Sequence, residues 1–170
     1  HHLVIREDKQ FTPYRLVFNP AVKFNDISLN QCLMKGPDLL NPIIGVMLKF
    51  REQPVGFVGD ISKCYHQIRV SEKDAHMTRF LWRDMETNRS PDIYITEVVT
   101  FGMKPAPATA NVALELTADE GAGTYPEASE VIRCCRYMDD IADSRPSVEE
   151  VIKLTKEIDT ILESGHFKTK

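Results

Sequence analysis

Short apolar runs alternate with polar stretches near the start of the chain. Residues 3–5 and 14–18 are rich in β-branched and aromatic side chains and flank a polar, charged stretch over residues 6–13. Two such runs on either side of a polar turn predict a β-hairpin, whose tip would carry Arg6, Lys9 and Arg15.

Apolar residues then recur at helical spacing within residues 37–53. Pro37 and Pro42 fall near the start of this segment, where a missing backbone N–H costs least, and Pro54 lies just beyond its end. We therefore expect a helix that ends before Pro54 and buries an apolar stripe in the core. The stripe consists of Leu39, Leu40, Ile43, Ile44, Met47 and Leu48.

Residues 55–61 form a short apolar run that ends in Asp60, which predicts a buried strand with a carboxylate at its end. A capping box over residues 147–150 predicts a helix to about Ser164, where Gly165 ends it. The other expected elements are a turn or short helix (62–67), strands (77–82 and 93–100), a turn (101–107), a helix (108–118) and a terminal strand. Helices mixed with largely antiparallel strands predict an α+β fold, with the helices on one face of the sheet.

Two adjacent carboxylates, Asp139 and Asp140, follow the apolar run Val131, Ile132, Cys134 and Cys135. Like charges a few Å apart raise each other's pKa unless a cation lies between them, so a metal ion is their natural partner. Neighbouring side chains of a strand point to opposite faces, so both could face one ion only where the chain turns. We interpret residues 131–144 as a β-hairpin with the two carboxylates at its tip. A polar turn that faces water is the alternative for this pair taken alone.

Composition limits the class of protein. A chain of 170 residues that is 42% apolar can bury one core, so we expect one domain. The four cysteines have neither a disulfide-framework nor a zinc-site spacing, which predicts free thiols and a reducing compartment. No apolar run is long enough to cross a bilayer, and no signal-peptide pattern precedes the first strand. We expect a soluble, intracellular protein with no membrane partner.

The net charge of −4 hides an asymmetry along the chain. Residues 1–83 carry 12 Lys and Arg against 8 Asp and Glu, whereas residues 84–170 carry 9 against 17. A basic first half and an acidic second half fit a protein that binds phosphates with one part and metal cations with the other. Solvated surface charge without a function explains the same asymmetry equally well.

Asp60 and the Asp139–Asp140 pair form a candidate catalytic set. Two-metal sites for phosphoryl transfer need hard carboxylate ligands that converge from separate segments, around ions about 3.5–4 Å apart. We therefore expect these carboxyl groups to lie within about 10 Å of one another, which is the reach of such a cluster.

Three stretches in this order resemble motifs A, B and C of reverse transcriptases: residues 57–65, residues 101–107 and residues 137–140. Arg15 before residues 16–17 resembles the fingers motif that lies upstream of them. Further stretches look more narrowly like the polyproteins of BEL/Pao-type LTR retrotransposons, namely residues 29–30, 36–40, 66–70 and 79–82. The resemblance covers nearly the whole chain, and four ordered matches are far more specific than one.

The resemblance implies the fingers and palm of a right-hand polymerase, with an antiparallel, ferredoxin-like palm sheet backed by helices. The fingers would comprise approximately residues 1–53 and 66–92, and the palm residues 54–65 and 93–170. The thumb would be absent from this stretch. Other parts of the Pol polyprotein (thumb, RNase H, integrase and protease) would be partners, and the protein would act in the cytoplasm or in virus-like particles.

The resemblance also implies the residues of the reaction centre. Asp60, Asp139 and Asp140 would be the catalytic carboxylates around two Mg²⁺ ions, or Mn²⁺ in their place. Asp60 and Asp139 would be the direct ligands, together with the backbone carbonyl of Ile61. Lys168 and Lys170 lie near the position of the family's motif D lysine, which is thought to protonate pyrophosphate.

Further roles concern an RNA template, a DNA primer and the incoming dNTP. Tyr65 falls where the family has an aromatic steric gate against a ribose 2′-OH, although an ordinary buried aromatic is the alternative. Arg15 would contact the triphosphate. Lys9 is a second candidate, with a solvated loop lysine as its alternative, and Phe101 would lie against the nascent base pair. The residues expected to contact or shape the template and primer site are Gly102, Tyr137, Met138, Lys104 and Pro107.

Two features depart from the family pattern. Many BEL/Pao elements have valine where Met138 stands, and Ala106 replaces a small hydroxyl residue. Two other functions stay open beside an active RNA-directed DNA polymerase, since a missing thumb would weaken the grip on the duplex. One is a remnant that binds nucleic acid without polymerising. The other is a different palm-type two-metal enzyme, such as an RNA-templated RNA polymerase or a nucleotide cyclase.

Overall fold

The computed structural model describes residues 2–5 and 14–170, which form two compact units. The first unit contains the described residues up to Lys35 together with residues 68–106. The second contains residues 36–67 and 107–170. The mixture of helices and antiparallel strands confirms the α+β class.

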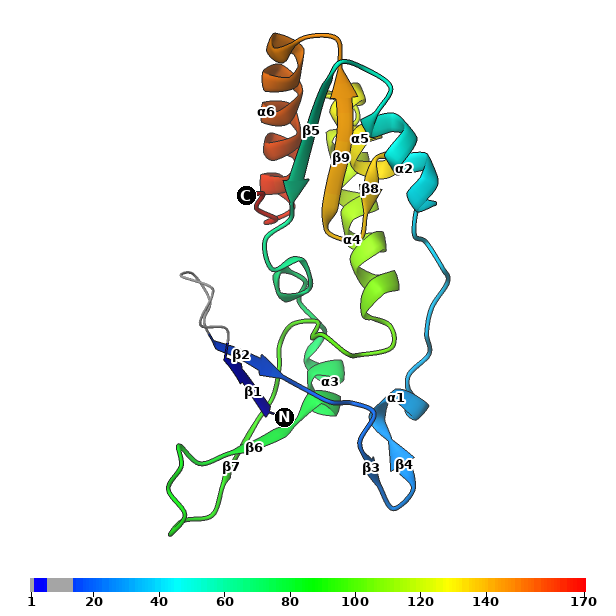
Figure 1. Ribbon diagram of the computed structural model, residues 1–170. Coiled ribbons are helices and arrows are strands. Elements are labelled where there is room, and N and C mark those ends of the chain that lie inside the picture. The colour runs from blue at the N-terminus through cyan, green and yellow to red at the C-terminus, as the bar shows by residue number, and fades with distance from the viewer. Residues whose placement is uncertain (1, 6–13) are drawn as a thin grey trace. The chain divides into compact units, whose positions relative to one another are not determined.

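The second unit is built on a three-stranded antiparallel sheet with the order β5-β9-β8 (Figure 1). These strands are β5 (Val55–Asp60), β8 (Arg136–Tyr137) and β9 (Asp140–Arg145). The helices of this unit are α2 (Ile43–Phe50), the 3-10 turn η1 (Cys64–Gln67), α4 (Ala106–Gly121), α5 (Pro126–Cys134) and α6 (Val148–Ser164).

Helices contact both faces of this sheet. The Ser144 hydroxyl donates to the Lys49 carbonyl of α2 at 2.6 Å, so α2 covers one face at that end of β9. The side chain of Arg145, the next residue of β9, points to the opposite face of the sheet. It donates to Glu127 of α5 at 3.0 Å. The expectation that all helices lie on one face is therefore wrong, because α2 takes the other.

The core of the second unit lies between α4, α5, α6 and the sheet. Its largest buried apolar side chains are Ile61, Leu114, Val131, Ile132, Ile141, Leu154, Ile158, Ile161, Leu162 and Phe167. Helix α6 begins and ends as the sequence predicted. The Ser147 hydroxyl accepts a hydrogen bond from the Glu150 N–H, and Gly165 forms the C-cap.

The first unit consists of short hairpins and helical turns. Strands β1 (His2–Ile5) and β2 (Tyr14–Val17) pair antiparallel, which confirms the predicted hairpin, although its tip lies outside the described residues. The remaining elements are β3 (Lys23–Phe24), β4 (Ile27–Ser28), α1 (Leu29–Cys32), α3 (Glu72–Ala75), η2 (His76–Thr78), β6 (Phe80–Trp82) and β7 (Asp92–Tyr94).

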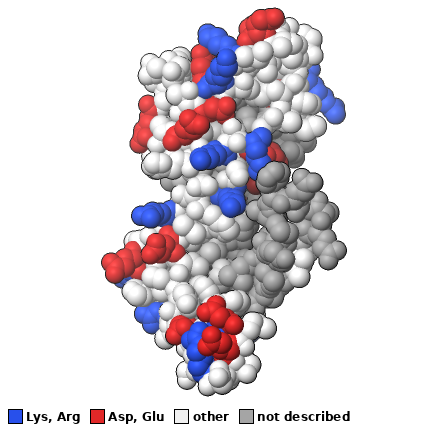
Figure 2. Space-filling model, turned by 90° about the vertical axis from the view of Figure 1, so that its left-hand side faces the viewer, with Lys and Arg blue, Asp and Glu red and all other residues white. Residues whose placement is uncertain are grey.

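The loop between β6 and β7 carries interleaved positive and negative side chains, seen at the lower end of Figure 2. Arg89 forms ion pairs there with Asp84, Glu86 and Asp92. The two strands that flank this loop are shorter than the predicted strands over residues 77–82 and 93–100.

Three local predictions in the second unit are wrong. The run Val131–Cys134 belongs to helix α5 and not to a strand, because Ala128, Val131 and Ile132 are spaced to bury one helical face. Helix α2 starts only at Ile43, and its apolar stripe is largely exposed. Strand β5 is an edge strand and not a buried one, since Val58 is 73% exposed.

All four cysteines are free thiols, as their spacing predicted. Cys64 and Cys135 are buried, whereas Cys32 and Cys134 are exposed. Within residues 2–5 and 14–170, none of the helices combines the length and the apolar character needed to cross a membrane.

The contact between α4 and α6 can be tested at Gly121. A Cβ atom there would lie 2.5 Å from Cγ1 of Ile161, a buried β-branched side chain that cannot move aside cheaply. We expect Gly121→Ala to lower the free energy of unfolding in urea by about 1–3 kcal/mol. Gly123→Ala is the matched control, because no atom lies within 4 Å of its Cβ position. Equal effects of the two substitutions would contradict this packing.

Candidate active site

The pairing of β5 with β9 brings the predicted carboxylates together. Asp60 and Asp140 are direct partners in the antiparallel register, and the Ile61 N–H donates to the Asp139 carbonyl at 2.8 Å. Directly opposed residues of antiparallel strands have Cα atoms about 4.5–5.5 Å apart and side chains on the same face. Asp60 and Asp139 are 79 positions apart in the sequence. The fold nevertheless places Asp139, at the turn before β9, next to the end of β5 that carries Asp60.

The turn between β8 and β9 is two residues long. Tyr137 pairs with Asp140, so Met138 and Asp139 form the tip of the hairpin and Asp140 is the first residue of β9. Met138 has φ = 57°, the left-handed conformation that tight hairpin turns require. The predicted hairpin is therefore present, but its first strand is limited to Arg136–Tyr137.

The close approach of Asp60, Asp139 and Asp140 changes the pKa values of groups in this site. Partial burial raises the pKa of the Asp140 carboxyl, and the charges of Asp139 and Asp60 raise it further. Burial also raises the pKa of the neighbouring Cys64 thiol to about 11, with Asp139 as the next largest cause. Cys64 is therefore a neutral thiol at pH 7.

Carboxylate oxygens are the hard ligands that Mg²⁺ takes, so the chemistry of this group fits a divalent ion. As they stand, however, no three His, Cys, Asp or Glu side chains in the described part of the chain converge closely enough to hold a metal. The Asp60 carboxylate instead lies 2.7 Å from the Lys170 ammonium. A metal ion at Asp60 would compete with this ammonium for the carboxylate.

Lys170 reaches Asp60 because the end of the chain pairs with the end of β5. The Lys170 N–H donates to the Asp60 carbonyl at 3.0 Å, and the Ser62 N–H donates to the Lys168 carbonyl at 2.7 Å. An isolated bridge between Ile61 and Thr169 lies between these bonds. This pairing is the short form of the predicted terminal strand, and it places Lys170 rather than Lys168 at the carboxylates.

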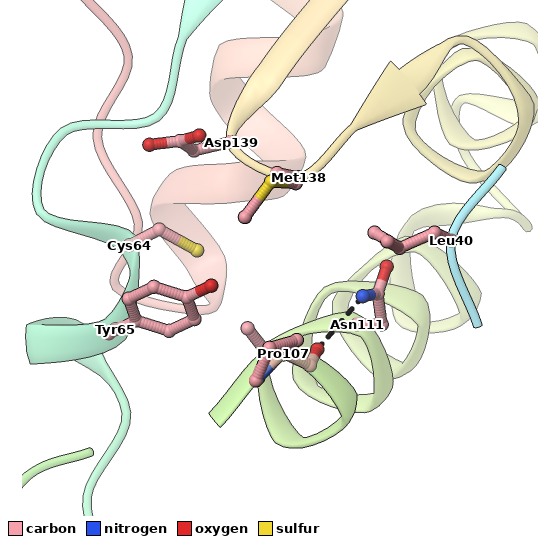
Figure 3. A pocket seen from close by; sticks show the side chains of 8 residues that line it. Leu40, Cys64, Tyr65, Pro107, Asn111, Met138 and Asp139 are labelled. Carbon is pink, nitrogen blue, oxygen red and sulfur yellow. Dashed lines mark hydrogen bonds between the residues drawn. The ribbon is translucent and has the colours of Figure 1, made fainter. Parts of the chain in front are cut away.

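A small cavity adjoins the Met138–Asp139 turn (Figure 3). It is lined by Leu40, Cys64, Tyr65, Pro107, Ala110, Asn111, Met138 and Asp139. The side chains of Tyr65, Met138 and Pro107 border the same space, so three residues with predicted substrate roles lie around one cavity. Burial raises the pKa of the Tyr65 phenol, and the charges of Cys64 and Asp139 contribute.

Among the other predicted substrate residues, Tyr137 lies in β8 of the second unit, whereas Arg15, Phe101, Gly102 and Lys104 belong to the first. Arg15 lies in β2, and Lys9 lies outside the described residues. Phe101 is 48% exposed, and Gly102 has φ = 90°, which favours glycine. A Cβ at Gly102 would lie 3.2 Å from Pro20, so the turn also has little room there for a side chain.

Asn30 of α1 forms hydrogen bonds to this turn, a role that the sequence did not predict. Its amide nitrogen donates to the Gly102 carbonyl at 2.9 Å, and its amide oxygen accepts from the Lys104 N–H at 2.9 Å. One side chain thus satisfies two backbone groups of the predicted motif B turn, as a paired strand would. Only the resemblance of residues 29–30 to retrotransposon sequences singled this position out, without indicating its contacts.

The fold brings carboxylates to the ends of two neighbouring strands, an arrangement that fits nucleotidyl transfer. A family model described as reverse transcriptase (RNA-dependent DNA polymerase) matches residues 14–170. The chain therefore belongs to the reverse transcriptase family and is an RNA-directed DNA polymerase. A comparison with curated proteins gives no match. Membership implies a nucleic-acid template and primer with dNTP as substrates, and the family generally uses divalent metal ions.

The Lys170–Asp60 ion pair can be tested by metal titration. Lys170→Met removes the cation that occupies Asp60, so we expect Mg²⁺ to bind about two- to fivefold more tightly in calorimetry without nucleic acid. The effect is small because Lys170 and Asp60 are exposed, and such pairs contribute up to about 1 kcal/mol. Lys168→Met is the matched control, since Lys168 forms no ion pair within the described part of the chain. Equal affinities in both variants would contradict the competition.

Proposed function

We propose that this chain is the fingers and palm segment of a Pol polyprotein from a BEL/Pao-type LTR retrotransposon. The fingers would comprise approximately residues 1–53 and 66–92, and the palm the remainder. The stretches that resemble this lineage, residues 29–30, 36–40, 66–70 and 79–82, support the proposal. Its partners would be the thumb, RNase H, integrase and protease of the polyprotein, in the cytoplasm or in virus-like particles.

The reaction would join the primer 3′-oxygen to the α-phosphorus of a dNTP. The bond from that phosphorus to the bridging oxygen breaks, and pyrophosphate leaves in line with the attacking oxygen. The observation that carries this proposal is the register of β5 and β9, with Asp60 opposite Asp140 and Ile61 bonded to Asp139. This register provides oxygen ligands on two adjacent strand ends.

The oxygen ligands would be the carboxylates of Asp60, Asp139 and Asp140 and the carbonyl of Ile61. Two Mg²⁺ ions, or Mn²⁺ in their place, would lower the pKa of the attacking hydroxyl and neutralise charge on the leaving group. Asp60 and Asp139 would be the direct ligands. Asp140, whose pKa is raised by burial and by both neighbours, would complete the negative charge of the site.

The remaining residues would orient the substrates. Arg15 and Lys9 would contact the triphosphate, and Tyr65 would exclude a ribose 2′-OH, since its ring borders the cavity beside Asp139. Phe101 would lie against the nascent base pair. Gly102, Tyr137, Met138, Lys104 and Pro107 would contact or shape the template and primer site, and Lys168 and Lys170 are candidates for the lysine that protonates pyrophosphate.

The carboxylate assignment is tested by primer extension on poly(rA)/oligo(dT), with the complete natural protein that contains this chain. We expect Asp60→Asn and Asp139→Asn each to lower kcat by about a hundred- to thousandfold, since each removes charge from the transition-state site. The double substitution Asp139→Asn with Asp140→Asn should abolish extension. Asp119→Asn, an exposed carboxylate at the far end of α4, should leave it unchanged.

Activity that survives the double substitution would refute the assignment. Wild-type protein that binds primer–template in a salt-dependent manner, yet extends no primer, would favour the non-catalytic alternative.

The steric-gate assignment is tested by sugar selection. We expect Tyr65→Val to raise the ratio of NTP to dNTP incorporation by at least tenfold, because a smaller side chain leaves room for the 2′-OH. Tyr125→Val, a change of the same size at the N-cap of α5, should leave the ratio unaltered. An unchanged ratio in Tyr65→Val would show that this ring is an ordinary packed aromatic.

A further inference from the structure

Arg136 is the largest side chain among those that are fully buried in the described residues. It lies in β8, directly before the Tyr137–Asp140 segment, and only 2% of its surface is exposed. Burying a guanidinium costs several kcal/mol, on the order of a large part of a domain's stability, unless its donors are paired. The donors of Arg136 therefore have to be paired with acceptors inside the fold.

The hydrogen bonds of Arg136 reach three different elements. Its Nη1 donates to the Met138 carbonyl at 3.1 Å and to Oδ1 of Asn111 at 2.7 Å. Its Nε donates to the Ile132 carbonyl near the end of α5 at 3.2 Å. No carboxylate within the described residues lies at ion-pair distance from it. The partners of this cation are therefore neutral oxygens that belong to the catalytic turn and to the helices behind it.

Asn111 extends this set of bonds into helix α4. Its amide nitrogen donates to the Pro107 carbonyl at 2.8 Å (Figure 3), and its amide oxygen accepts from Arg136. Asn111 is 3% exposed, so water does not compete for these bonds. A continuous hydrogen-bonded series thus runs from Pro107 through Asn111 and Arg136 to Met138.

The last acceptor in this series is the strained residue of the turn. A non-glycine residue in the left-handed conformation, such as Met138 at φ = 57°, costs about 1–2 kcal/mol. A hydrogen bond to its carbonyl offsets that cost and restricts the peptide that leads into Asp139. The orientation of Asp139 consequently depends on a side chain that touches neither substrate nor carboxylate.

We propose that Arg136 is a positioning residue, which together with Asn111 fixes the Met138–Asp139 turn to helix α4 so that Asp139 faces its partners across the strand. This inference rests on the proposed function, because it assigns the geometry of the same catalytic turn. Burial lowers the pKa of Arg136, and electrostatic interactions with Cys64 and Glu115 oppose that shift.

The test uses Arg136→Met, Arg136→Lys and Asn111→Leu in the complete natural protein, assayed by primer extension at varied dNTP concentration. A displacement of about 1 Å in a catalytic group costs on the order of a hundredfold, so we expect Arg136→Met to lower kcat by about 10- to 100-fold. KM for dNTP should change by less than about threefold, because no substrate contact is removed. Arg136→Lys, which keeps a donor, should recover part of kcat.

Arg145→Met is the matched control. Arg145 lies at the opposite end of β9, is also largely buried, and forms hydrogen bonds to Asp143 and Glu127. We expect this variant to lose stability in urea unfolding without a comparable loss of kcat. Combining Arg136→Met with Asn111→Leu should lower kcat by less than the product of the single effects, because both residues act through one series of bonds.

Amide hydrogen exchange gives a readout that does not require activity. Exchange at residues 138–140 should accelerate in Arg136→Met and stay unchanged in Arg145→Met. Equal exchange and an unchanged kcat in Arg136→Met would overturn the inference, as would equal losses of kcat in both arginine variants. If Arg136→Met does not fold, Arg136→Lys is compared with Arg145→Met by the same criteria.

The reference variant Asp139→Asn separates this inference from the proposed function. Wild-type protein no more active than Asp139→Asn would refute the proposed function, while hydrogen exchange would still decide the role of Arg136. An active wild type, an inactive Asp139→Asn and a fully active Arg136→Met would refute only the role of Arg136.

Discussion

The site depends on a strand pairing that its own charges oppose. Asp60 and Asp140 are direct partners between β5 and β9, and Asp139 precedes Asp140 at the turn. Like charges that face each other across two strands are destabilising. The register nevertheless continues over six pairs, from Val55 with Arg145 to Asp60 with Asp140. A slip by one residue would move every side chain of β9 to the other face, so the buried Ile141 helps to hold the carboxylates in place.

The opposite end of β9 is held by polar groups that are themselves buried. The Ser144 hydroxyl accepts from the Gln53 N–H at 3.0 Å and donates to Lys49 of α2. Asp143, 3% exposed, pairs with Arg145 on the other face. Buried groups of this kind are costly to leave unpaired, by about 1–3 kcal/mol each, so they tie the strand to a single register. These bonds stabilise the end of β9 that lies farthest from Asp140.

Features that rest on local signals could be predicted from the sequence. Ser147 and Gly165 delimit α6 because capping and helix termination involve only nearby backbone groups. The apolar run before Asp60 predicted the end of one strand, and the adjacent carboxylates Asp139 and Asp140 predicted the tip of a hairpin. That these carboxylates lie close together was predicted from the chemistry of a shared cation and from the resemblance to reverse transcriptases. Periodicity alone does not predict it.

Features that depend on tertiary partners could not be predicted. The apolar run at residues 131–135 fits a strand or a helix, and the choice is made by contacts such as Ser129 to the Ala118 carbonyl of α4, at 2.7 Å. The stripe on α2 is apolar, yet Ile44 is 74% exposed, because periodicity does not indicate whether another element covers a face. Lys170 beside Asp60 and Asn111 beside Arg136 are likewise pairs that no local pattern joins.

Two basic side chains of this region, Lys170 and Arg136, differ in how easily they can be displaced. Lys170 is a surface ammonium, 67% exposed, and its ion pair with Asp60 contributes up to about 1 kcal/mol, so a doubly charged ion can displace it. Arg136 cannot be displaced in this way, since moving it would leave the Met138 carbonyl and the Asn111 amide without their partner. The proposed nucleotidyl transfer needs both properties. The ligands have to change partners as substrate enters, while the turn that carries Asp139 has to keep its conformation throughout.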